Sequence, residues 1–386
     1  MDNIDQQYND QLEWFTSQGL VLDSRVERRQ VNGIYGMYAT EDIPKGTEVL
    51  TSPLEVKFPL NTKYTYPNEF SFNEKYTHSV VIEIEKGKNS KYFWFFQKLE
   101  SMEYLKENSC YFYSAEELSI LEKMNPVLHQ QIEKFILVIQ TSINAVCDFD
   151  ESIDKDIALQ IRLNLSSRSW TDLGVLPIFE LFNHDDMKGV IIQTSTNRTK
   201  RAYVACVDYK ANEQIWGSYK KRDMYDFAIA YNYFDPNGTH YIAPTKRFFQ
   251  FAENDLEKSI FKLTSQRHKL NSNEKDGVIC YQLAESEVFL LEGGPNIKLI
   301  SYIRNNCFQS FDELKRGVCN DLSFDKKMMQ ILNFLLEVNK VDEFQIEDIP
   351  EKLHRFHDML VKEKEMLLAN ISWVNANSDH YLLDGL

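Results

Sequence analysis

The sequence offers little cysteine chemistry. Its six cysteines lie far apart, and no two of them have the CxxC spacing of a zinc cluster or a thioredoxin-like redox site. At 386 residues the chain is also too long to be a small disulfide scaffold. We therefore expect free thiols in a reducing compartment and no bound metal.

Long apolar runs are missing as well. No stretch approaches the ~18–20 apolar residues that a membrane-spanning helix needs. The first ten residues, MDNIDQQYND, are acidic and polar, unlike a signal peptide. These absences favour a soluble protein of the cytoplasm, with the nucleus as the alternative, that does not bind a membrane.

Basic residues are fewer than acidic ones, 43 against 58. The net charge is −15 and the pI about 5.1. Because a polyanion repels phosphate backbones, the charge disfavours a nucleic-acid partner. We expect the chain to be a monomer.

Apolar and aromatic residues are plentiful. They make up 43% and 13% of the chain, which is typical of a folded protein and too rich for a disordered one. The length allows one large globule or two domains with a sizeable core.

The most informative stretch is Gly174–Asp186, which reads GVLPIFELFNHDD. Its apolar run ends at Asn183 and His184, and a buried polar pair needs hydrogen-bond partners from the protein or from a ligand. Glu180 and His184 also have the i, i+4 spacing of two metal ligands on a helix. The sequence has no second histidine cluster to complete such a site, so we favour a cofactor site without metal.

An earlier stretch, residues 33–50, reads GIYGMYATEDIPKGTEVL. It predicts strand, glycine-bracketed loop, strand, turn and strand. Pro44 presets φ early in the turn, and Gly46 accepts a positive φ late in it. The loop lacks the GxGxxG and GK[ST] spacings of phosphate-binding loops. Alone, these features indicate only a β-meander.

Residues of about 76–165 have a mainly helical pattern between two β-rich segments. Ser114 suits the N-cap of a helix. Pro126 breaks or kinks this helix. Ile132, Ile139 and Ile143 then recur on one helix face. The sequence therefore predicts a helical insertion.

Arg168 follows the insertion in the segment SSRSW. A buried arginine binds a carboxylate. The partner is either an acid of the protein, such as Glu180 or Asp185, or the carboxylate of a small ligand. The sequence leaves both readings open.

Strands and a short helix follow the Asn-His pair. Asn212 takes the place in its turn that Gly46 holds in the earlier one, and asparagine tolerates a positive φ. The run 214–219 predicts a strand ending in Tyr219, and Asp223–Ile229 predicts a short helix that leads to Tyr231 and Tyr233.

Taken in order, the glycine loop, the helical insertion, SRSW, LPIFELFNH, the Gln-Ile-x-x-x-Tyr strand and AYNYF resemble the SET-domain methyltransferases. The Rubisco large-subunit methyltransferase-like class is the most similar. The resemblance implies an α+β fold. A β-rich SET domain over residues 1–240, with a knotted cofactor site, is interrupted by the helical insertion. The resemblance also implies an all-α-like domain over residues 245–386 that binds a lysine-bearing protein substrate, a partner that suits the acidic charge of the chain.

The resemblance further implies a protein-lysine N-methyltransferase that uses S-adenosylmethionine. Histidine methylation and a catalytically silent binding module are the alternatives. It assigns Tyr35, Gly36, Met37, Arg168, Asn183 and His184 to the cofactor, Tyr219 and Tyr231 to catalysis, and Tyr233 to the target-residue channel.

Four positions depart from the family pattern. Glu180 stands where aspartate is common, Lys220 and Asn232 where glycine is common, and Met224 where asparagine is common. These departures bear on activity and specificity rather than on the fold.

Overall fold

The computed structural model describes residues 4–31, 34–54, 58, 60–90, 92–97, 99–170, 174–175, 182–185, 188–194, 199–219, 222–236, 238–244, 289–296, 299–300, 303 and 321–377. The chain divides into two compact units. Unit 1 holds residues 1–112 and 134–220, and unit 2 holds residues 113–133 and 221–386. The domain boundary expected between residues 240 and 245 stays a prediction.

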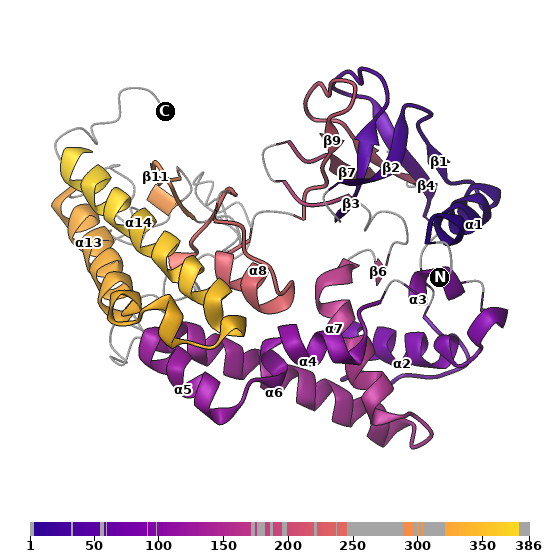
Figure 1. Ribbon diagram of the computed structural model, residues 1–386, viewed down its shortest axis with the longest axis horizontal. Coiled ribbons are helices and arrows are strands. Elements are labelled where there is room, and N and C mark those ends of the chain that lie inside the picture. Colours follow the sequence, from indigo (N-terminus) through magenta and orange to yellow (C-terminus); the bar gives the residue numbers. More distant parts are fainter. Residues whose placement is uncertain are drawn as a thin grey trace, which may run out of the picture. The chain divides into compact units, whose positions relative to one another are not determined.

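Unit 1 contains two small antiparallel sheets and a hairpin (Figure 1). Their strands are β1 (Val21–Leu22), β4 (Glu48–Pro53), β8 (Lys200–Val204) and β7 (Ile191–Thr194) in the first sheet; β2 (Val26–Val31), β3 (Ile34–Ala39) and β9 (Gln214–Ile215) in the second; and β5 (Ser169–Trp170) with β6 (Gly174–Val175) in the hairpin. Each sheet combines strands from before and after the helical insertion, so the interruption predicted from the sequence is confirmed.

Both turns expected to need a positive φ have one. Gly46 has φ 88° and Asn212 has φ 70°. Only glycine takes this backbone conformation without steric cost, and asparagine tolerates it better than most residues. The sequence pattern was therefore sufficient to place these turns.

One hydrophobic core holds the β-rich part of unit 1 together. Helix α1 (Ile4–Ser17), which the apolar spacing of residues 2–19 predicts, contributes Phe15. Met37, Phe182 and Tyr203 join it from segments far apart in the sequence, and each is at most 2% exposed. Burial of these large side chains fixes the segment that carries Asn183 and His184 against the sheets.

The helical insertion begins at Phe72 and ends at Arg168. Its helices are α2 (Phe72–Ile84), α3 (Phe93–Phe96), α4 (Met102–Asn108), α5 (Ala115–Met124), α6 (Pro126–Phe149) and α7 (Lys155–Arg168). Ser114 and Glu117 form a capping box at the start of α5, and Pro126 opens α6 at a position where its missing N–H costs nothing. The division between the units falls within α6.

Unit 2 contains α8 (Met224–Ala230), α13 (Asp321–Val338), α14 (His354–Asn377) and the hairpin of β10 (Leu290–Leu291) and β11 (Gly294–Pro295). The hairpin adds strand to a region predicted as all-α-like. Apolar spacing predicts a helix from Ile349, and α14 begins five residues later, at His354. The same spacing predicts helices over residues 256–270 and 311–318, which lie outside the described residues. No helix of the described chain is long and apolar enough to cross a membrane.

Candidate functional site

Residues Phe182–Asp185, which we call the FNHD segment, lie beside the extended run 214–219. The N–H of Gly217 donates to the carbonyl of Asn183 across 2.7 Å, and the N–H of Asp185 donates to the carbonyl of Gly217 across 3.0 Å. These bonds form a short parallel bridge. The Asn-His pair is thereby held by main-chain hydrogen bonds.

The run 214–219 also has a partner on its other side. The N–H of Val190 donates to the carbonyl of Trp216 across 2.7 Å, and its own carbonyl accepts from Ser218 across 3.1 Å. The strand predicted over the whole run therefore changes partners. It ends as β9 at Ile215, and the chain then lies between the FNHD segment and Val190.

Two glycines permit this close packing of backbones. A Cβ atom on Gly189 would lie 2.3 Å from the carbonyl oxygen of Asp185, and one on Gly217 would lie 3.0 Å from Cβ of Phe182. Real Cβ atoms essentially never approach another heavy atom to under 3.0 Å. Glycine is therefore needed at position 189 for close approach, not for a positive φ, and a side chain at position 217 would press against Phe182.

Asn183 connects the FNHD segment to the first glycine loop. Its Nδ2 donates to the main-chain carbonyl of Tyr35 across 2.9 Å. The β3–β9 ladder pairs only Met37 and Tyr38, so Tyr35 and Gly36 lie beyond its end. At Tyr35 and Gly36, β3 is therefore not paired with β9, and the side chain of Asn183 hydrogen-bonds there instead.

Gly36 completes this arrangement. A Cβ atom there would lie 2.5 Å from Nε2 of Gln214 and 3.1 Å from Nδ2 of Asn183. Glycine therefore lets two side-chain amides meet over the β3 backbone. We call Gly36, Asn183 and Gln214 the cradle. Met37, the next residue along the strand, is fully buried, and its side chain belongs to the core.

Gln214 was not among the residues that the sequence assigned to the site. Its Oε1 accepts a hydrogen bond from the Tyr38 hydroxyl across 3.2 Å. Its Nε2 is buried and finds no hydrogen-bond partner in the described part of the chain. A buried donor without a partner costs free energy unless a ligand or water satisfies it. The one available signal was its place in the Gln-Ile-x-x-x-Tyr strand.

Tyr219 holds the FNHD segment from a second direction. Its N–H donates to Nδ1 of His184 across 3.1 Å, and its hydroxyl donates to the carbonyl of Phe182 across 3.0 Å. The rings of Tyr219 and His184 stack with centroids 4.9 Å apart. Because Nδ1 accepts, the proton of a neutral His184 ring sits on Nε2. In the parallel bridge to Gly217, the hydrogen bonds come from Asn183 and Asp185. The backbone N–H and carbonyl of His184 therefore face away from Gly217.

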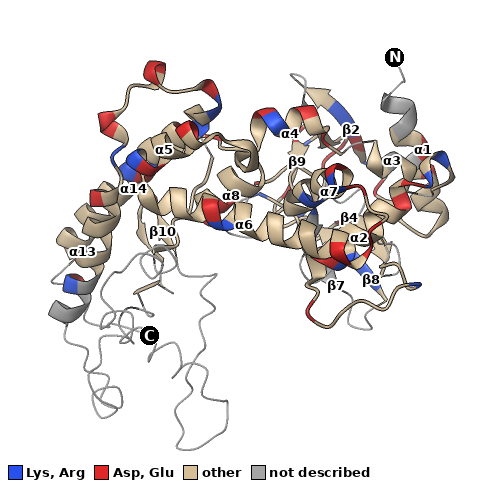
Figure 2. Ribbon diagram, turned by 90° about the horizontal axis from the view of Figure 1, so that it is seen from below, with Lys and Arg blue, Asp and Glu red and all other residues tan. Residues whose placement is uncertain are grey.

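Arg28 of β2 packs on the ring of Tyr35. The guanidinium carbon lies 3.7 Å from the Tyr35 ring centroid and 4.9 Å from that of Tyr8. The arginines of β2 appear as a blue band on that strand (Figure 2). Burial raises the pKa of Tyr8, and the cation of Arg28 opposes the shift. This stack orders the residue whose carbonyl receives Asn183.

Arg168 ends α7 and has a protein partner. Its Nη2 lies 3.2 Å from Oε1 of Glu100, and its Nε donates to Oδ1 of Asn164 across 3.4 Å. The structure therefore contains the protein-acid pairing that was one of the two readings of this arginine. Its role toward a ligand carboxylate stays a prediction.

Comparison with known families identifies the fold around the cradle. A family model of the SET domain matches residues 34–220, which include the glycine loop, the FNHD segment and Tyr219. The chain contains a SET domain. The resemblance drawn from the sequence motifs is thus confirmed.

Solved structures give the same result for the whole chain. "Crystal structure of the SET domain of LSMT bound to Lysine and AdoHcy" has a TM-score of 0.59 at 14% identity, covering 97% of this chain and 92% of that one. "Structure of Rubisco LSMT bound to Sinefungin and Monomethyllysine" has 0.58 at 14%, covering 97% and 93%. "Structure of Rubisco LSMT bound to AdoMet" has 0.56 at 15%, covering 97% and 93%. No curated protein sequence matches the chain. At this identity the likeness establishes the fold, a SET domain with a helical insertion and a helical C-terminal region.

Two predicted site residues follow the SET match and belong to unit 2. Tyr231 ends α8, where its N–H donates to the carbonyl of Phe227 across 3.0 Å. Burial raises the pKa of Tyr231, and Arg222, 5.7 Å from the ring centroid, opposes the shift. The phenol is therefore neutral near pH 7. Tyr233 is 59% exposed.

The departures Asn232 and Met224 also lie in unit 2. Asn232 has φ 53°, which explains why glycine is common there and why asparagine can replace it. Met224 is the first residue of α8, and its side chain is buried in unit 2. Asp223 before it caps the helix by accepting from the N–H of Tyr225 across 2.8 Å. Glu180 and Lys220, the other two departures, lie outside the described residues.

The candidate metal pair Glu180 and His184 includes Glu180, which lies outside the described residues. Among the described residues no group of three or more His, Cys, Asp or Glu side chains is placed to hold an ion. The carboxylate of Asp185, the residue after His184, accepts from the N–H of Lys188 across 2.8 Å. It stabilises a turn of the SET domain.

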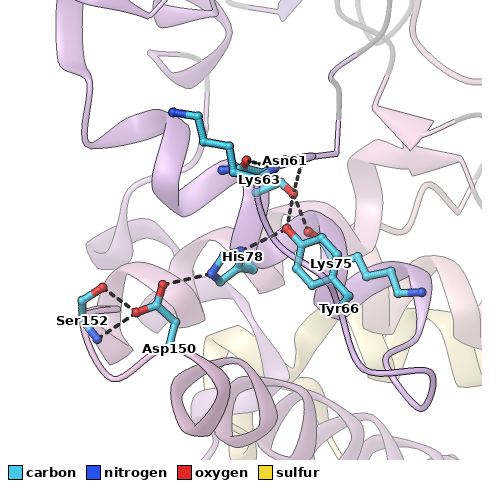
Figure 3. Close-up of polar contacts among 8 residues, drawn as sticks. Asn61, Lys63, Tyr66, Lys75, His78, Asp150 and Ser152 are labelled. Atoms are coloured by element: carbon cyan, nitrogen blue, oxygen red, sulfur yellow. Dashed lines mark hydrogen bonds and ion pairs between the residues drawn. The ribbon is translucent and has the colours of Figure 1, made fainter.

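A second polar cluster lies in the helical insertion (Figure 3). The fully buried ring of His78 contacts the Tyr66 hydroxyl at 3.1 Å through Nδ1 and the Asp150 carboxylate at 3.2 Å through Nε2. The Tyr66 hydroxyl lies 2.9 Å from Oγ of Ser79, which also accepts from the main-chain N–H of Asn61. Sequence reasoning missed this cluster. It fastens the segment around Tyr66 to α2 and to the end of α6.

Proposed function

We propose that the chain is an S-adenosylmethionine-dependent protein methyltransferase that acts on lysine. The observation that carries the proposal is the cradle: Gly36, Asn183 and the buried Nε2 donor of Gln214 meet at the open edge of β3 in a SET fold. The titles of the similar LSMT structures name AdoMet, AdoHcy, lysine and monomethyllysine.

The residues of the cradle suit the proposed cofactor. The Nε2 donor of Gln214 has no partner among the described residues, and Gly36 lets that donor and the Asn183 amide lie against the β3 backbone, where a ligand acceptor could meet them. Tyr35, Gly36, Asn183 and His184 would hold the cofactor through main-chain groups and the asparagine amide. Arg168 would bind its carboxylate, since a guanidinium matches a carboxylate in charge and geometry.

The cofactor, when bound, supplies an electrophilic methyl group. The chain has to align a nucleophile with that group, and a well-oriented geometry supplies much of the rate. Tyr219 holds the FNHD segment in place through its N–H and its hydroxyl. Tyr231 offers a neutral phenol whose oxygen can orient an amine. An apolar, aromatic surrounding lowers the pKa of a lysine and favours its unprotonated, nucleophilic form.

The charge of the chain supports a basic protein as substrate. At −15 the protein attracts lysine-bearing partners and repels nucleic acid. We place the substrate contacts in the helical C-terminal region and the protein in the cytoplasm. The free thiols of Cys110, Cys147 and Cys206 agree with a reducing compartment.

The test is a transfer experiment with S-adenosylmethionine carrying an isotope-labelled methyl group, the purified chain and a cell lysate. Mass spectrometry should find the label on lysine, and Tyr231→Phe should lose most of it while S-adenosylhomocysteine still binds. Label on histidine would correct the target residue. Partner capture without any label would contradict the enzymatic proposal and favour a binding module.

A further inference from the structure

Three residues of α7 hold Glu100 of the helical insertion through hydrogen bonds and an ion pair, and we call this set of contacts the grip. Gln160, Asn164 and Arg168 are spaced by four, so they lie along one face of the helix. The N–H of Glu100 donates to Oδ1 of Asn164 across 2.9 Å. Its carbonyl accepts from Nδ2 of Asn164 across 3.1 Å and from Nε2 of Gln160 across 2.9 Å. Both main-chain groups of Glu100 are therefore fixed by side-chain amides.

This grip places the carboxylate of Glu100 against Arg168. Nη2 of Arg168 lies 3.2 Å from Oε1 of Glu100. Asn164, which holds the Glu100 backbone, is 1% exposed, and its Oδ1 also accepts from Nε of Arg168 across 3.4 Å. Because the backbone is already ordered, the ion pair forms at little further cost in conformational entropy.

The ion pair itself is accessible to water. The side chains of Arg168 and Glu100 are 22% and 32% exposed. Such a pair contributes little net free energy, so breaking it costs little. Another carboxylate can therefore replace that of Glu100, which water then solvates.

We infer that Glu100 is an internal competitor for the carboxylate that Arg168 binds, and that it weakens the affinity of this site for amino-acid ligands. The inference rests on the proposed function, in which that ligand is the cofactor. Binding then requires the guanidinium to leave one carboxylate for another. A chain without the competing charge should bind the cofactor and its product more tightly.

The test compares the intact chain with Glu100→Gln in calorimetric titrations. Glutamine keeps the size of the side chain and leaves the main-chain grip in place. S-adenosylhomocysteine, which has the carboxylate, should bind the variant about two- to fivefold more tightly, the range that a partly exposed ion pair gives. 5′-Methylthioadenosine, which lacks the carboxylate, should bind both proteins equally.

Glu107→Gln is the matched control, because it removes one exposed charge from the same insertion. It should leave both affinities unchanged. Equal or weaker binding of S-adenosylhomocysteine to Glu100→Gln would overturn the inference, and weaker binding would show that Glu100 orients Arg168 instead. If the unmodified chain bound neither ligand, the proposed function would fail, and this inference with it.

Discussion

The amide of Asn183 donates to the main-chain carbonyl of Tyr35 across 2.9 Å, although 148 residues separate the two in the sequence. This bond joins the two parts of the SET domain at the open edge of β3. Gly36, next to Tyr35, leaves the space in which Asn183 and Gln214 meet. The proposed cofactor site depends on this junction.

Gly36→Ala should abolish the cradle with little loss of stability. The added Cβ would lie 2.5 Å from Nε2 of Gln214, the far end of a flexible side chain that can move away. Affinity for S-adenosylhomocysteine should fall at least about tenfold, equivalent to about 1.4 kcal/mol. Gly293→Ala is the control, because its Cβ would meet no atom within 4 Å. Calorimetry that found equal affinity in Gly36→Ala would contradict the assignment.

Asp150→Asn should destabilise the insertion in a pH-dependent way. The Ser152 hydroxyl and, after it, His78 hold the pKa of Asp150 below its ordinary value. A lowered folded-state pKa adds stability above the unfolded value of about 3.9, and this stability is lost as the pH falls through the folded value. At pH 7 the variant should lose about 1–2 kcal/mol of unfolding free energy.

The measurement is denaturant unfolding of both proteins from pH 7 down to pH 3. The difference between them should narrow below about pH 4. Asp148→Asn, an exposed position in the last turn of α6, should have no effect at any pH. A difference that stays constant over the whole range would show that the carboxylate charge plays no part.

Glu363→Ala should strongly destabilise unit 2. This carboxylate on α14 is 1% exposed and accepts from the Tyr225 hydroxyl across 3.0 Å and from Nδ2 of Asn339 across 2.9 Å. Removing it leaves buried donors unsatisfied, at a cost of about 3 kcal/mol or more. Glu365→Ala, 66% exposed at its side chain, should change stability by less than about 0.5 kcal/mol. Equal unfolding midpoints for the two variants would refute this role of Glu363.

Features set by local chemistry could be predicted from the sequence. The turns at Gly46 and Asn212 follow from residues that accept a positive φ. The capping box at Ser114 follows from its spacing to Glu117. The helical insertion follows from apolar periodicity, and the SET fold from the order of several motifs along the chain.

Features that depend on distant contacts could not be predicted in the same way. Glu100 and Arg168 are 68 residues apart, and His78 and Asp150 are 72 apart, so nothing in their local sequence pairs them. From the sequence, Gln214 is an ordinary strand residue, and only the fold shows that its side-chain amide lies against Gly36. The strand predicted over residues 214–219 is shorter as a sheet element because Gly217 bonds the FNHD segment instead of β3.

Cofactor binding at Asn183 is best measured by titrating the intact chain and Asn183→Ala with S-adenosylhomocysteine. The intact chain should bind one equivalent. The variant loses the bond to Tyr35 and one wall of the cradle, so its affinity should fall by about tenfold or more while its unfolding midpoint changes little. Equal affinity in the two proteins, or no binding to the intact chain, would contradict the claim that this SET domain holds its cofactor at Asn183.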